Sequence, residues 1–153
     1  MGEEGRDADV MEGALRAGEV EVRMRVAEVR VATVRAMAAD IAIREDFDLD
    51  ALADLKLAVD EACATVLVKA RPDGLLVCRL LVTPSKVEMH ATAATDNGHP
   101  PGTEALGWHM LQVLTDSAGC WITGDGSENR RMHVRFTISR LQAASGRSQS
   151  GMS

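Results

Sequence analysis

The sequence predicts an α+β fold, a two-layer sandwich in which helices cover one face of a mostly antiparallel sheet. Several segments alternate apolar and polar residues with a period of two, as strands with one buried face do. Other segments repeat apolar residues every three or four positions, as amphipathic helices do. The segments follow one another as strand, two helices, two strands, irregular stretch, helix and two strands. This order is typical of helices packed on a single side of a sheet.

The first elements follow from changes in this period. Alternation over residues 20–26 predicts a half-buried strand. An apolar stripe from Val31 to Ile41 then predicts a helix that ends near Arg44. An acidic turn follows, in which Asp48 or Asp50 can cap the next helix.

The next segment is the helix around which the rest of the chain is organised. It ends at Arg71-Pro72-Asp73-Gly74, where Pro and Gly turn the chain. Its apolar face consists of Leu52, Leu55, Val59, Cys63, Val66 and Ala70. Leu57, Glu61 and Thr65 form a second line beside that face. A carboxylate beside an apolar stripe is costly unless it is hydrated, paired or used, so Glu61 is either a solvated surface group or a functional one.

Two strands and an irregular stretch come next. Residues 75–82 are apolar on both faces apart from Arg79, as a central strand would be. A short turn leads to an alternating strand over residues 87–93. Residues 95–104 are rich in Gly and Pro, and long irregular loops of this kind are often functional.

The last part of the chain predicts a helix and a hairpin. Helical spacing resumes at Leu106 and continues to about Ser117. Residues 120–123 and 132–138 predict two strands joined through a Gly-rich loop.

The ends of the chain differ from its middle. Residues 1–18 are rich in Gly and acid and predict a flexible acidic leader, whereas residues 141–153, rich in Ser, Gly and Gln, predict a disordered tail. All periodic segments lie in residues 19–140, the expected domain. No signal pattern or membrane-length apolar run is present in the sequence. We therefore expect a cytoplasmic protein without a membrane partner.

Composition narrows the class of partner. The chain has 153 residues, 46% of them apolar, which predicts one globular domain. Its formal net charge of −6 is the wrong sign for a general nucleic-acid coat. Aromatic residues make up 3%, which leaves few platforms for stacking bases. We expect a protein partner and no direct nucleic acid. Three widely spaced cysteines with apolar neighbours predict buried free thiols: Cys63, Cys78 and Cys120.

The irregular stretch begins with a motif that suits a nucleotide. Asp96 can accept a hydrogen bond from an exocyclic amine, and Gly98 allows close approach. Backbone N–H groups at the start of the following helix can hold phosphate. Asp-x-Gly is also common in simple turns, so the motif alone leaves both interpretations open.

Three segments taken together resemble the consecutive boxes of the RsbW-type anti-sigma factor kinases, members of the histidine-kinase-like (GHKL, Bergerat-fold) ATPase superfamily. They are Leu57-Ala58-Val59-Asp60-Glu61-Ala62-Cys63, Asp96-Asn97-Gly98, and Gly107-Trp108-His109-Met110-Leu111 with Leu114 and Asp116. The resemblance spans about residues 20–140. It implies that residues 19–140 form a histidine-kinase-like ATPase domain.

The resemblance implies roles for five residues. Glu61 would polarise the attacking hydroxyl in a protein serine kinase reaction that uses ATP and Mg²⁺. Asp96 would bind the adenine amino group, and Gly98 would shape the base pocket. Gly107 would lie where the helix start meets the phosphates. Thr65 stands where the family has a magnesium-ligating Asn, and a neutral hydroxyl is a weaker ligand.

Further departures concern the glycines. The second Gly of the family's Asp-x-Gly-x-Gly is replaced by Pro100, which fixes φ. The first Gly of the later Gly-x-Gly is replaced by Ala105. These changes predict weak or lost kinase activity.

As the resemblance implies, the expected function is that of an anti-sigma factor that sequesters an alternative sigma factor. A STAS-domain anti-anti-sigma protein would counter it, and a homodimer is expected. The alternative is an active serine kinase that phosphorylates the STAS antagonist with ATP and Mg²⁺. A third interpretation is an unrelated α+β domain with Glu61 and Asp96 as surface carboxylates. If the family assignment holds, the carboxyls of Glu61 and Asp96 should line one cleft.

Overall fold

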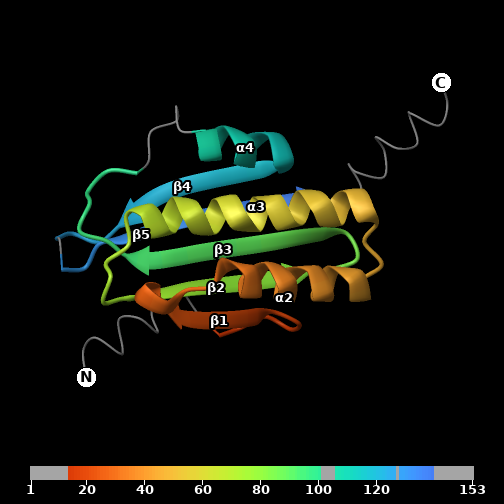
Figure 1. Cartoon of the computed structure of the whole chain (residues 1–153), viewed down its shortest axis with the longest axis horizontal. Coiled ribbons are helices and arrows are strands. Elements are labelled where there is room, and N and C mark those ends of the chain that lie inside the picture. Colours follow the sequence, from red (N-terminus) through yellow and green to blue (C-terminus); the bar gives the residue numbers. More distant parts are fainter. Residues whose placement is uncertain (1–13, 101–105, 127, 140–153) are drawn as a thin grey trace.

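A five-stranded antiparallel sheet carries three α-helices on one face (Figure 1). A computed structural model describes residues 14–100, 106–126 and 128–139. The strand order is β1-β2-β3-β5-β4. The elements are β1 Val20–Arg25, η1 Val26–Glu28, α2 Val31–Arg44, α3 Leu49–Val68, β2 Leu75–Val82, β3 Lys86–Ala94, α4 Leu106–Leu114, β4 Ser117–Thr123 and β5 Arg131–Ser139. The predicted α+β two-layer sandwich is confirmed.

Most predicted elements form where the sequence placed them. The helix expected to end near Arg44 ends at that residue, and Asp48 caps α3 by accepting a hydrogen bond from the backbone N–H of Ala51. The last helix, expected to continue to about Ser117, ends at Leu114 instead. Ser117 begins β4 because it is already paired with Thr137 of β5, so sheet pairing overrides the helical spacing there.

Helix α3 lies at the centre of the helical layer, between α2 and α4 (Figure 1). The predicted apolar stripe faces the sheet, with Leu55, Val59 and Cys63 at 1% exposure or less. This burial supplies the main stabilisation of α3. Ala70, predicted as the last member of the stripe, lies beyond the end of α3 at Val68 and forms a β-bridge with Thr95 instead. Cys78 of β2 is buried as well, whereas Cys120 of β4 is half-buried, and all three cysteines are free thiols.

Several expectations lie outside the described residues. The predicted leader is described only from residue 14 onwards, and the tail over residues 141–153 is not described. Residues 101–105 of the Gly/Pro-rich stretch are likewise outside. Among the helices that the structure describes, none is both long and apolar enough to cross a membrane.

The sheet face without helices carries a histidine pair. His90 and His133 point away from the core, since their neighbours Met89 and Val134 on the same strands are core residues. The distance from His90 Nε2 to His133 Nδ1 is 3.0 Å, and His133 Nε2 lies 2.7 Å from Thr123 Oγ1. The indole of Trp121 stacks on the His133 ring at a centroid distance of 5.1 Å. Burial lowers the pKa of both histidines to about 4.

We expect this pair to make folding stability depend on pH. Because the pKa of His90 and His133 is about 4 in the folded chain against an ordinary value of 6.5, the unfolded chain binds more protons between these pH values. Stability that is fully present above pH 6.5 is therefore lost as the pH falls towards 4. The urea midpoint should decrease over this range.

A double variant tests the assignment. His90→Gln with His133→Gln should flatten the pH dependence of the urea midpoint between pH 6.5 and 4. His109→Gln removes an exposed histidine of α4 and should leave the dependence unchanged. An unaltered slope in the double variant would assign the pH dependence to other groups.

Candidate functional site

The first cluster of predicted site residues lies where the start of α4 meets the middle of α3. Glu61 and Thr65 are one turn apart on α3. Gly107 lies so close to them that a Cβ atom added to it would be 2.6 Å from Glu61 Oε2 and 3.9 Å from Thr65 Oγ1. A larger residue at position 107 would force the carboxylate to move. The packing of α4 on α3 therefore brings three predicted site residues together.

The side chains of this cluster differ in what they can still bind. Thr65 Oγ1 donates to the backbone oxygen of Glu61 at 2.7 Å, which uses its single proton and leaves its lone pairs. Glu61 is half-buried and forms no ion pair with any described residue. Its carboxylate can therefore accept a proton from a hydroxyl group. In the described part of the chain, no group of three His, Cys, Asp or Glu residues is arranged to hold a metal ion.

A neighbouring ion pair fixes this part of α3 to α2. Arg35 of α2 donates to both carboxylate oxygens of Asp60, at 2.9 and 2.8 Å. This two-oxygen contact is directional and involves the residue directly before Glu61. No role was predicted for Arg35, because its spacing within α2 gives no signal for this contact.

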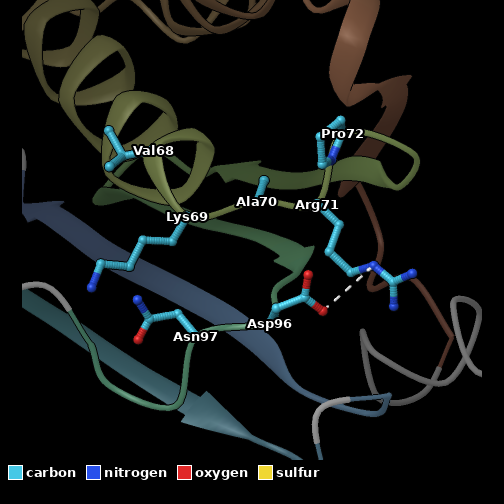
Figure 2. A pocket seen from close by; sticks show the side chains of 7 residues that line it. All are labelled: Val68, Lys69, Ala70, Arg71, Pro72, Asp96 and Asn97. Carbon is cyan, nitrogen blue, oxygen red and sulfur yellow. Dashed lines mark ion pairs between the residues drawn. The ribbon is translucent and has the colours of Figure 1, made fainter.

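The second cluster surrounds a pocket of about 360 Å³ at the C-terminal end of α3 (Figure 2). Its lining residues are Val68, Lys69, Ala70, Arg71, Pro72, Asp96 and Asn97. The carboxylate of Asp96 is 74% exposed and points towards Arg71, whose Nε lies 3.8 Å from Asp96 Oδ1 (Figure 2). A ligand that binds Asp96 must therefore compete with, or lie beside, the guanidinium of Arg71.

Hydrogen bonds from Thr95 attach the Asp96 loop to the end of α3. Thr95 Oγ1 donates to the backbone oxygen of Lys69 and accepts from the backbone N–H of Asn97. Lys69 Nζ in turn donates to the backbone oxygen of His99 at 3.3 Å. These contacts give Asp96 a defined backbone position, which a binding residue needs.

Gly98 lies beside this pocket and is not among its lining residues. A Cβ atom at Gly98 would be 3.2 Å from the guanidinium of Arg130. The same guanidinium donates to the backbone oxygen of Asp96 at 3.3 Å. In this structure Gly98 therefore makes room for Arg130, which holds the Asp96 loop.

The five predicted site residues thus form two groups. Glu61, Thr65 and Gly107 are together, and Asp96 and Gly98 are together. The described lining of the Asp96 pocket does not include Glu61, so the expectation of one shared cleft is not met by that pocket. Glu61 and Lys69 are eight residues apart, about 12 Å along the axis of α3. Residues 101–105, which connect the groups in sequence, lie outside the described residues.

Sequence reasoning missed the basic residues around Asp96. Lys69 and Arg71 lie at the end of a helix, where cations commonly complement the helix dipole, so they gave no separate signal for a ligand. Arg130 gave no such signal, because its position depends on the pairing of β5 with β3.

Comparison with known proteins identifies relatives. No family model matches the chain. The chain is 35% identical over 135 residues to the anti-sigma-F factor RsbW of Mycobacterium tuberculosis strain CDC 1551 / Oshkosh. The match to the protein of the same name in strain ATCC 25618 / H37Rv has the same extent. In both cases it covers 87% of this chain and 78% of the relative.

Proposed function

The chain belongs to the RsbW family of anti-sigma factors, and we propose that it sequesters an alternative sigma factor and is countered by a STAS-domain anti-anti-sigma protein. The observation that carries this proposal is the relation to RsbW over most of the chain. The α+β sandwich and the acidic composition are compatible with a protein that acts by binding another protein. A homodimer in the cytoplasm is part of the proposal.

The two clusters support a nucleotide site as a second part of the proposal. Asp96 would hold the adenine amino group in its exposed pocket. The backbone N–H groups at the start of α4, next to Gly107, would face the phosphates. Magnesium would neutralise phosphate charge, with Thr65 as a weak ligand beside Glu61. The exposed carboxylate of Asp96 and the close approach of Gly107 to Glu61 and Thr65 support this assignment.

Other features favour weak or lost phosphate transfer. Arg71 already pairs with Asp96. A neutral hydroxyl is also a poorer magnesium ligand than an amide oxygen. The alternative, an active serine kinase acting on the STAS antagonist, is favoured by the carboxylate of Glu61, which no described basic side chain neutralises.

Sigma-factor binding tests the first part. Purified chain is mixed with each alternative sigma factor of the source genome, with and without ATP and Mg²⁺, and complexes are detected by size-exclusion chromatography. One sigma factor should co-elute and be displaced by the STAS-domain protein. If no sigma factor binds in any nucleotide state, the sequestration proposal fails.

A thermal shift tests the nucleotide site, with Asp96→Asn as the variant. We expect ATP with Mg²⁺ to raise the Tm of the unaltered chain, because a ligand that binds only the folded state stabilises it. Asp96→Asn should remove this increase. Asp73→Asn is the matched control, since Asp73 pairs with the same Arg71 at 3.3 Å and should leave the increase intact. No shift in the unaltered chain would reject the nucleotide site while leaving sequestration untouched.

A further inference from the structure

A second cavity lies at the edge of the sheet that is farthest from α4. It has a volume of about 330 Å³ and is lined by Arg23, Met24, Arg25, Glu28, Arg30 and Thr33. These residues come from β1, η1 and the start of α2, which follow one another along one edge of the molecule (Figure 1). The cavity is therefore separate from both clusters of the candidate nucleotide site.

The charge around this cavity is opposite to that of the chain. Arg23, Arg25 and Arg30 line it together with a single acid, Glu28, although the net charge of the chain is −6. Arg30 forms no ion pair with any residue that the structure describes. The other two arginines pair with carboxylates: Arg23 with Glu21, whose side chain is 16% exposed, at 3.2 Å, and Arg25 with the exposed Glu28 at 3.9 Å. The exposed pair of Arg25 and Glu28 is weak and exchanges readily with a ligand carboxylate.

The backbone next to the cavity can also accept a partner. β1 is an edge strand that pairs with β2 on one side, and no described strand pairs with its other side. An exposed edge binds extended segments through main-chain hydrogen bonds. A second copy of this chain would bring the same arginines to the same edge and be repelled. The charge instead selects a segment that carries carboxylates.

We propose that this basic edge, formed by the backbone of β1 with Arg23, Arg25 and Arg30, binds an extended acidic segment of a partner protein. The start of α2 adds to the attraction, because its first turn contains no acid and its N-cap residue Arg30 makes no side-chain cap. The cavity shares no lining residue with the pocket at Asp96, so a partner held here can remain bound while that pocket is occupied. Nucleic acid is disfavoured by the negative charge of the whole chain.

Fluorescence anisotropy with a defined probe tests this surface. The probe is a fluorescein-labelled peptide that alternates Glu with Val, titrated with the full chain. Arg25→Gln combined with Arg30→Gln should weaken binding by roughly threefold to tenfold, as expected for loss of two exposed ion pairs. Arg44→Gln, which removes an exposed arginine at the other end of α2, is the matched control and should bind as the unaltered chain does. Added salt should weaken binding.

Four results would overturn the proposal. The first is equal affinity for a peptide in which Gln replaces Glu. The second is tighter binding of an oligothymidine than of the acidic peptide. The third is peptide binding that leaves hydrogen exchange of the β1 amides unchanged, since strand addition must protect them. The fourth is self-association that is lost in the double variant, which would assign this edge to a second copy. None of these results bears on ATP or sigma-factor binding.

Discussion

If the chain acts as the proposed serine kinase, Glu61→Gln is expected to reduce phosphate transfer to the proposed STAS-domain antagonist by about 10²- to 10⁴-fold, the usual contribution of a general base. Glutamine keeps the shape of the side chain and loses the ability to accept a proton. Glu61 is suited to that role because it is half-buried next to Gly107 and has no ion-pair partner among the described residues. Transfer is measured with labelled ATP and Mg²⁺. If the unaltered chain transfers phosphate only slowly, transfer by Glu61→Gln should fall to the background of the assay.

Two further measurements separate chemistry from folding. Binding of the sigma factor should be retained in Glu61→Gln, because no described contact of the carboxylate supports the fold. Gly107→Ala should also slow transfer, because its methyl group would displace Glu61 Oε2, while the urea midpoint changes little. Undiminished transfer in Glu61→Gln would show that another group accepts the proton.

The fold was predictable because its signals are local. Alternation over β1 and β3, the apolar stripe of α3 and the cap at Asp48 each depend on residues close in sequence. The end of α4 was not predictable in the same way. The apolar spacing up to Leu114 does not show where the helix stops, and the chain turns into β4 because Asp116 N donates to Thr137 O and Ser117 pairs with Thr137.

The site was predictable as a set of residues and not as an arrangement. Glu61 and Gly107 meet only because α4 packs on α3. The contact between Arg71 and Asp96 depends on the bridge between Ala70 and Thr95, which joins the end of α3 to the end of β3. Such contacts between distant segments leave no periodic signal in the sequence. The order of the motifs therefore identified the site residues but not their division into two groups.

Gly124→Ala is expected to destabilise the folded chain by about 2–4 kcal/mol. Gly124 has φ of +98°, which costs a residue with a side chain about 1–2 kcal/mol. A Cβ atom there would also lie 2.1 Å from the backbone oxygen of Asn129. Backbone cannot rotate away as a side chain can, so the turn between β4 and β5 must open. Urea unfolding should show a lower midpoint with a similar slope.

Gly126→Ala in the same turn is the matched control. No atom of the described residues other than its chain neighbours lies within 4 Å of a Cβ added to Gly126, so its midpoint should stay close to that of the unaltered chain. The comparison also bears on the candidate site, because Arg130 follows this turn. The backbone oxygen of Arg130 accepts a hydrogen bond from Thr95 N, and its guanidinium donates one to the backbone oxygen of Asp96. Opening the turn should therefore weaken any ATP-dependent thermal shift along with the fold. Equal midpoints for the two variants would mean that the turn relaxes without cost and that the Asp96 loop is held independently of it.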